Sequence, residues 1–434
     1  MIKDGKINVL KLVIAMMLLT SSMMVLQIAG QTFFLLLQIV LCIYMFLISK
    51  RVVFENNFFI LFIVIESVIG MAFSIISEMP LSYKKGSVYM TGLLIIMYFA
   101  SAYVIYLLDY DKIDMNFIKL CIKAIFVIQM HWTIVQYILY AVASIDINNS
   151  IFVEMLGMVE EASAYKVGNY FMPSGFCWHP SVLVPIVVLS YFMFDSYYLK
   201  ILTILTAFLC RNSTALICIL VCIGVSVAKY IIDILRIRRM KRNVLILCIV
   251  MATVGLGVAY ATGILDMVID KIVYLIQRIF GLVNDHGSGD AHRRYYTEYF
   301  NVLEFSSVPQ IIFGYGIGCS GYPFTEMFGQ YGNHASWAVE SDIMNILLSR
   351  GILGFVLYYG MLLFIAIKGF KISYKYLCAT IILIIGGITY NIQFDWLFLI
   401  NIFMLYCVNN GINWFDNSGK RQIASGEIDR STIK

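Results

Sequence analysis

Charged side chains are scarce in this chain: Asp, Glu, Lys and Arg make up 13% of its 434 residues. A soluble domain averages about 25% charged residues, so the composition excludes an ordinary soluble fold. Proline is also rare, with 6 residues, and no linker rich in proline, glycine or serine divides the chain. Hydrophobic residues account for 61% of the sequence, and the mean hydropathy is +0.85. These values indicate a polytopic integral membrane protein.

Several motifs are missing as well. No small-residue cleavage site follows the first apolar run, so this run is predicted to be a transmembrane helix and not a signal peptide. Residues 316–321 match the spacing of a dinucleotide-binding fingerprint, but they lack the strand before it and the helix after it. His286, His292 and His334 lack the spacing of a metal site. No metal and no other cofactor is therefore expected.

The apolar runs predict an all-α architecture of about twelve transmembrane helices, because a spanning helix needs roughly 20 apolar residues. The run at 197–210 is too short to cross upright, so a count between about eleven and thirteen fits. The predicted spans are 8–28, 31–49, 58–77, 88–108, 117–143, 178–195, 197–210, 212–232, 243–263, 350–367, 376–391 and 395–409.

Basic residues set the expected orientation, because lysine and arginine concentrate in cytoplasmic loops. The strongest anchor is the cluster at 236–242, which places both termini in the cytoplasm. The loops 144–177 and 264–349 then face outward. One integral membrane domain is expected over residues 1–415, followed by a polar cytoplasmic tail over 416–434. Cys177 and Cys319 fall in the two outer loops, and their spacing leaves open whether they pair.

The first candidate site is the segment 171–181, which includes Pro173, Gly175 and His179 just before an apolar run. It is interpreted either as a turn that starts a helix, with Ser181 helping to cap it, or as a segment in which His179 contacts a ligand. The two interpretations weigh about equally.

Arginines form the second and third candidates. Arg211 lies at an outer membrane boundary, where its planar guanidinium could bind two oxygens of a diphosphate or bond to lipid headgroups. Arg293 and Arg294 precede two tyrosines, in a pattern that suits a polyanionic head group or a solvated helix face. Arg278 lies in the same outer loop.

The fourth candidate runs from Glu340 to Gly354. Asp342, Asn345 and Ser349 recur at a spacing of three and four, so they share one helical face. We expect this polar stripe to lead from the outer face into a spanning helix, with a carboxylate at its outer end acting as a general base. A polar seam against a neighbouring helix is the alternative.

Two titratable residues fall inside predicted spans. Glu66 and His131 are each expected to be a neutral group that bonds to a neighbouring helix, with a proton-relay role as the alternative. The rest of the membrane interior is expected to be nearly free of polar groups.

In these segments the chain resembles the bacterial O-antigen and capsular polysaccharide polymerases (Wzy-type), in the superfamily that includes the O-antigen ligases. The resemblance covers residues 165–370, in the expected order. Ligases typically have a histidine where this chain has Glu340. In having an acidic residue at this position, the chain is more similar to the capsular polymerases. The matching pieces are 173–176 with 180–181, 211–216, the arginines 293–294 ahead of 312–316, and 340–342 through 351–354.

The resemblance implies a GT-C-like fold in the bacterial inner membrane and a metal-independent glycosyltransferase. Its substrates would be undecaprenyl-diphosphate-linked oligosaccharide repeat units. A growing glycan would pass from its lipid diphosphate to the non-reducing end of the next unit, on the outer face. The implied partners are membrane lipid, a chain-length regulator and a flippase, with no nucleic acid. The implied diphosphate ligands are Arg211, Arg293, Arg294 and Arg278, and the implied acceptor-side residues are Glu340, Asp342, His334 and His179.

Two other functions remain open. An O-antigen ligase would transfer finished glycan to another acceptor. A lipid-linked oligosaccharide flippase or transporter would have a similar number of spans, but transporters concentrate polar groups at the bilayer midplane.

Overall fold

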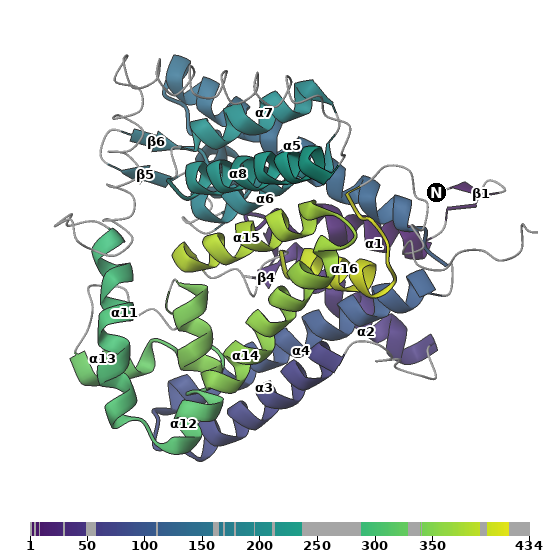
Figure 1. Ribbon diagram of the computed structural model, residues 1–434. Coiled ribbons are helices and arrows are strands. Elements are labelled where there is room, and N and C mark those ends of the chain that lie inside the picture. The colour runs from purple at the N-terminus through teal and green to yellow at the C-terminus, as the bar shows by residue number, and fades with distance from the viewer. Residues whose placement is uncertain are drawn as a thin grey trace, which may run out of the picture. The chain divides into compact units, whose positions relative to one another are not determined.

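The computed structural model shows a helical membrane protein (Figure 1). It describes residues 2–3, 6–7, 9–28, 31–48, 58–109, 112–158, 165–167, 170–177, 179–194, 196–210, 213–236, 288–328, 339, 341–390 and 397–415. The chain divides into two compact units: one comprises residues 1–219 and 306–434, and the other residues 220–305.

Four described helices are long and apolar enough to cross a membrane. They are α3 (Phe58–Ile76), α4 (Leu81–Asp109), α5 (Met115–Ala143) and α14 (Asp342–Phe370). The shorter apolar helices are α1 (Val9–Thr20), α2 (Phe33–Ile48), α6 (Pro180–Met193), α7 (Tyr197–Leu209), α8 (Ser213–Arg236), α15 (Tyr374–Thr389) and α16 (Leu397–Asn409).

These apolar helices coincide with eleven of the predicted runs, and the run at 243–263 lies outside the described residues. Whether the shorter ones span a bilayer stays a prediction. The remaining elements are the π-helix η1 (Asn149–Met155) and the helices α11 (Ser288–Phe305), α12 (Val308–Phe313) and α13 (Tyr322–Phe328).

The chain also contains strands, which the sequence analysis did not predict. Three antiparallel pairs of two or three residues a strand form β1–β2 (Ile2–Lys3 and Lys6–Ile7), β3–β4 (Gln27–Ile28 and Gln31–Thr32) and β5–β6 (Tyr165–Val167 and Tyr170–Met172). Each pair joins segments that follow one another closely in sequence, so the all-α class is unchanged.

The contacts of the first unit separate its helix ends into two sets. At one set of ends, Lys375 Nζ donates to the carbonyls of Phe192 and Phe415, at 3.2 and 3.4 Å, and Lys119 Nζ donates to Asn413 O at 3.4 Å. At the other, Tyr89 OH donates to Gln31 Oε1 at 2.6 Å. Lys375 and Lys119 therefore tie several helix ends of the first unit together.

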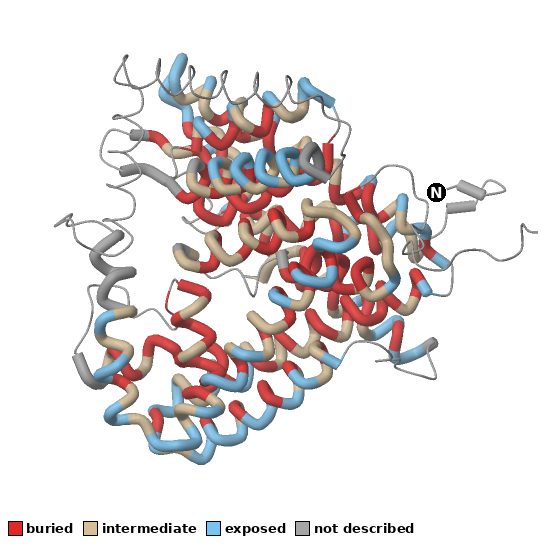
Figure 2. The backbone as a smooth tube through the Cα atoms, in the orientation of Figure 1, coloured by how far each residue is buried: buried red, intermediate tan, exposed pale blue. Residues whose placement is uncertain are grey.

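Burial in the first unit follows the helix faces (Figure 2). Large apolar residues such as Phe46, Phe62 and Leu363 are exposed on the helices, while the polar residues Glu66, Asp342 and Arg350 are buried. A membrane protein has this distribution, because lipid solvates apolar side chains and polar groups turn toward one another.

Candidate functional site

The helix α14 is broken at Gly351, where φ is 64° and ψ is −168°. On an unbroken helix, Asp342 and Tyr359 would be about 25 Å apart along the axis. Instead, a Cβ on Gly387 of α15 would lie 3.2 Å from Asp342 Cβ and 3.3 Å from the Tyr359 hydroxyl oxygen. The chain therefore reverses at Gly351, and α14 consists of a first arm, Asp342–Arg350, and a second arm, Ile352–Phe370.

Backbone contacts hold this break. The last carbonyls of the first arm cannot reach amides one turn further on, because the helix ends there. Tyr315 N donates to Leu348 O at 2.7 Å, and Gly316 N donates to Ser349 O at 2.9 Å. The segment that follows α12 thus completes the hydrogen bonding of the first arm.

Two glycines allow this close approach. A Cβ on Gly314 would collide with the backbone nitrogen of Arg350, and one on Gly351 would collide with the carbonyl oxygen of Ile312. Both glycines also have positive φ, which side chains with a Cβ rarely adopt. The segments 312–316 and 351–354, which belong to two different pieces of the predicted resemblance, therefore lie against each other.

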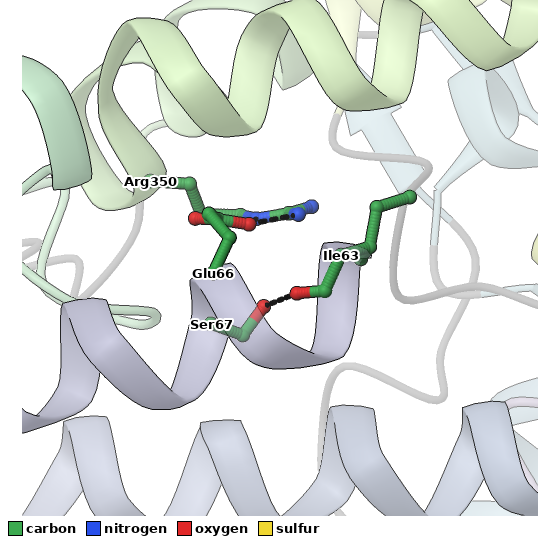
Figure 3. A network of polar contacts seen from close by, with 4 residues as sticks. All are labelled: Ile63, Glu66, Ser67 and Arg350. Carbon is green, nitrogen blue, oxygen red and sulfur yellow. Dashed lines mark hydrogen bonds and ion pairs between the residues drawn. The ribbon is translucent and has the colours of Figure 1, made fainter. Parts of the chain in front are cut away.

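An ion pair lies at the break (Figure 3). Arg350, the last residue of the first arm, donates from Nε at 3.1 Å and from Nη2 at 2.5 Å to one oxygen, Oε2 of Glu66 on α3. The exposed fractions of the two side chains are 1% and 2%. Removing one partner of such a buried pair typically costs about 3–5 kcal/mol, because the other charge is left alone in an apolar interior.

More polar groups surround this pair. Tyr98 of α4 lies within electrostatic range of Arg350, Glu66 and Asp342, and Tyr358 of the second arm lies within range of Asp342 and Arg350. Asn401 Nδ2 of α16 donates to Tyr358 OH at 3.4 Å. We call the five residues Glu66, Tyr98, Asp342, Arg350 and Tyr358 the charged centre.

The position of Asp342 bears on the two interpretations of the polar stripe. The stripe was predicted either to lead from the outer face into a spanning helix or to form a seam against a neighbouring helix. Asp342, Asn345 and Ser349 are all buried, which favours the seam. The first arm packs inside the unit, so the stripe lines a seam between helices. The predicted span at 350–367 corresponds to the second arm, and the first arm precedes it.

A second polar network surrounds the segment 173–177. Gly175 N donates to Gln136 Oε1 at 2.8 Å, Phe176 N donates to Gln129 Oε1 at 2.9 Å, and Asn148 Nδ2 donates to Gly175 O at 2.9 Å. We call Gln129, Gln136 and Asn148 the amide clamp. A Cβ on Gly175, where φ is 64°, would collide with Gln129 Oε1.

The clamp is tied to its surroundings. Gln129 Nε2 donates to Ser22 O at 2.9 Å, and Trp132 Nε1 donates to Asn148 Oδ1 at 2.9 Å. The Trp132 ring stacks on Phe176 with centroids 4.6 Å apart. The segment 173–177 is thus held inside the helical unit, and this positions the residues just after it.

His179 caps α6. Its Nδ1 accepts a hydrogen bond from Ser181 N at 3.1 Å, and Pro180 occupies the first helical position. The expectation that Ser181 helps to cap the helix is therefore wrong, because the imidazole takes that place. The ring of His179 also stacks on Tyr390, with centroids 6.1 Å apart. These contacts favour the helix-start interpretation of the segment.

The end of α15 joins two of the predicted segments. Tyr390 stacks on His179, Ser341 Oγ donates to Gly387 O at 3.4 Å, and a Cβ placed on Gly387 would lie 3.2 Å from Asp342 Cβ. His179 and Asp342 therefore approach the same short stretch of backbone, residues 386–390, although 163 positions separate them in sequence.

The other predicted site residues are not brought to this place by the described structure. Arg293 and Arg294 belong to α11 in the second unit, and their joining the site stays a prediction. Glu340, His334, Arg211 and Arg278 lie outside the described residues, and so does His292 as a side chain.

The residues expected inside the membrane differ from their predictions. Glu66 bonds to a neighbouring helix as expected, but its partner is a cation, so it is part of an ion pair. His131 is exposed, and its Nδ1 lies 2.8 Å from Val127 O of its own helix. The expectation of a nearly apolar interior is wrong for the first unit.

Sequence reasoning missed the role of Arg350, which was assigned to the outer boundary of a span. Two signals could have pointed to it: an arginine directly before a glycine inside an apolar run, and an unexplained carboxylate, Glu66, in another run. Opposite charges inside membrane segments usually pair.

Cys177 and Cys319 do not form a disulfide with each other. The Cys177 thiol donates to Ser22 O at 3.6 Å, and the Cys319 thiol donates to Tyr83 O at 3.3 Å. Burial raises the pKa of Cys319 to about 12, so this thiol stays protonated at neutral pH.

Comparison with known proteins gives no relative: no family model and no curated protein matches this chain.

Proposed function

We propose that the protein is a polysaccharide polymerase that acts on undecaprenyl-diphosphate-linked repeat units outside a bacterial inner membrane. The hydroxyl at the non-reducing end of one unit attacks the anomeric carbon of the glycan on another. The bond from that carbon to the diphosphate oxygen breaks, undecaprenyl diphosphate leaves, and the hydroxyl proton passes to a base. The reaction consumes no nucleotide sugar.

One observation carries this proposal. The segments that resemble the polymerases are distant in sequence, yet 312–316 packs on the break of α14, while His179 and Asp342 both contact the end of α15. Segments that share a reaction have to meet in space. The resemblance alone fixes only their order in the chain.

The proposed roles follow from charge and reach. Asp342 is the candidate base on the acceptor side, together with Glu340 and His334, because a carboxylate or imidazole can accept the hydroxyl proton. His179 positions the end of α15 beside it. Arg211, Arg278, Arg293 and Arg294 would bind the diphosphate, whose leaving oxygens gain negative charge as the bond breaks.

The finer architecture belongs to the same proposal. A polymerase of this kind would have about twelve spans in a GT-C-like arrangement. Both termini would lie in the cytoplasm, and the loops 144–177 and 264–349 would face outward.

The test is incubation of the purified protein with a synthetic lipid-diphosphate repeat unit, followed by separation of the products by size. A ladder of longer lipid-linked glycans is expected. Arg294→Ala should remove the ladder, while Glu304→Gln, an exposed carboxylate on the same helix, should keep it. A wild-type protein that leaves the unit unchanged would end the proposal.

A transporter of lipid-linked units is a second candidate, favoured by the charged centre and the broken α14. Transporters often place buried charge beside interrupted helices. In proteoliposomes, movement of a labelled unit across the bilayer without chain growth would decide for transport. Chain growth in the same vesicles would decide for the polymerase.

A further inference from the structure

A small rotation of the first arm of α14 about Gly351 would displace its far end, where Asp342 lies. Asp342 at the far end and Arg350 at the break are eight positions apart, a length of about 12 Å along the helix. Turning the arm by ~10° at Gly351 would move Asp342 by ~2 Å. A displacement of about 1 Å at a reacting group can cost about a hundredfold in rate. The angle of this arm therefore matters for any chemistry at Asp342.

Backbone contacts alone do not set that angle. The hydrogen bonds from Tyr315 and Gly316 reach carbonyls of the last turn of the first arm, close to the axis about which it would turn. A contact near the pivot resists sliding better than it resists rotation. Rotation is resisted by contacts that lie away from this axis: the hydrogen bond from Ser341 Oγ to Gly387 O at the far end of the arm, and a side chain that reaches sideways to another helix.

The Glu66–Arg350 pair has that geometry. Arg350 is the last residue of the first arm, and its guanidinium extends to Glu66 on α3 (Figure 3). The helix α3 also contacts the second arm, since Phe59 and Phe364 have ring centroids 5.5 Å apart. One helix thus supports both arms, and the ion pair links it to the first.

The chemistry of the pair also argues against a purely stabilising role. Two nitrogens of Arg350, Nε and Nη2, donate to the same oxygen, Glu66 Oε2. Glu66 Oε1 and Arg350 Nη1 have no hydrogen-bond partner among the described residues. Apolar side chains of similar volume often give equal or greater stability than a buried ion pair. Apolar packing is not directional. A charge-assisted hydrogen bond, in contrast, fixes the angle between its two groups.

We infer that the Glu66–Arg350 ion pair is a positioning pair, which fixes the angle of the first arm at Gly351 and so sets the place of Asp342. Neither residue touches the reacting atoms. The consequence for catalysis rests on the proposed polymerase function, whereas the consequence for the arm itself does not.

Three variants test this inference in the purified protein with a synthetic lipid-diphosphate repeat unit. Glu66→Gln keeps the shape and removes the charge, and Arg350→Lys keeps the charge and removes the planar fork. Glu66→Leu combined with Arg350→Met replaces the pair by apolar packing. Glu78→Gln, an exposed carboxylate just after α3, is the matched control.

Glu66→Gln and Arg350→Lys should lower kcat by about 10- to 100-fold while KM for the lipid-linked unit stays within about threefold, because substrate binding is not altered. The double variant should insert into the membrane and have a melting temperature no lower than that of Glu66→Gln. Its kcat should nevertheless stay reduced. A role in stability alone predicts the opposite for the double variant, with kcat restored.

Hydrogen exchange gives a readout that does not depend on the function. In Glu66→Gln, amides of the first arm and of Tyr315 and Gly316 should exchange faster than in the wild type. Unchanged exchange, or a double variant with wild-type kcat, would overturn the inference and leave the polymerase proposal intact. If the amides of the first arm exchange faster in Glu66→Gln but the wild-type protein makes no ladder of products, the polymerase proposal fails and the positioning role of the pair stands.

Discussion

The first unit contains two buried polar regions built on different chemistry. The amide clamp consists of neutral groups, which bind the segment 173–177 through three hydrogen bonds of 2.8 to 2.9 Å, and a fourth bond of 2.9 Å ties Gln129 to Ser22. The charged centre instead contains an arginine and two carboxylates. The clamp therefore holds a loop segment through neutral hydrogen bonds, while the centre holds opposite charges between helices of the unit.

Unsatisfied atoms sharpen the difference. In the clamp, only Gln136 Nε2 lacks a hydrogen-bond partner among the described side chains of its three residues. Around the charged centre, Glu66 Oε1, Arg350 Nη1, both amide atoms of Asn345 and Ser349 Oγ lack one. A buried polar group left without any partner costs about 1–3 kcal/mol. Proteins retain that cost mainly where function requires it.

The largest effect is expected from Asp342→Asn. The substitution keeps the size of the side chain and removes the ability to accept a proton, so kcat for polymer formation should fall by about 10²–10⁴-fold. Melting in detergent should change little. Asp109→Asn, at the exposed last position of α4, is the control. Polymer formation by Asp342→Asn at the wild-type rate would place the base elsewhere.

The next effect concerns the break in α14. Gly351→Ala puts a Cβ against the Ile312 carbonyl oxygen at φ 64° and ψ −168°, a conformation essentially restricted to glycine that alone costs about 1–3 kcal/mol for another residue. Both the melting temperature and kcat should fall. Gly360→Ala, on the second arm where no atom lies near the new Cβ, should melt at or slightly above the wild type. Equal melting temperatures for Gly351→Ala and Gly360→Ala would argue against a helix break at Gly351 that only glycine can adopt.

A smaller effect on activity is expected in the amide clamp. Gln129→Leu removes the hydrogen bonds to Ser22 and Phe176 and should destabilise the protein by about 1–3 kcal/mol. The kcat of the folded fraction should stay within about threefold of the wild type. Quantifying folded protein by size-exclusion chromatography before the assay separates the two quantities. A much larger loss per folded molecule would give the clamp a part in the reaction.

The smallest expected effect concerns the chemical reactivity of the buried Cys319 thiol. With a pKa of about 12, Cys319 should be thiolate in about one molecule in 10⁴ at pH 8, and only the thiolate alkylates readily. Mass spectrometry of its peptide should show maleimide labelling only after denaturation. A cysteine introduced by Val308→Cys, at an exposed position of α12, should label at once. Comparable labelling rates would mean that the segment next to the break is open to solvent.

Much of the fold could be predicted from the sequence, because long apolar runs have few other stable conformations in a membrane. The runs at 58–77 and 117–143 correspond to α3 and α5. The spacing of Asp342, Asn345 and Ser349 also placed them correctly on one helical face. The sequence left open whether this face leads to the outer surface or forms a seam, and the burial of the three residues favours the seam, because polar groups of a membrane helix turn toward other helices.

The break at Gly351 could not be predicted, because a glycine in an apolar run fits an ordinary membrane helix. Its conformation follows from the approach of the segment 312–316, which lies about 35 residues earlier in sequence. The cap formed by His179 was missed for a related reason: Ser181 is the commoner capping residue type, and only the local geometry shows which side chain reaches the amide.

The most direct test of the account asks whether a lipid-linked unit reaches the first arm. A photo-reactive amino acid can replace Ile343, which is half-buried beside Asp342, or Ile367, which is exposed near the far end of the second arm. On illumination, a labelled undecaprenyl-diphosphate repeat unit should crosslink at 343 and be displaced by excess unlabelled unit. Crosslinking at 367 alone, or at both positions without competition, would contradict the account.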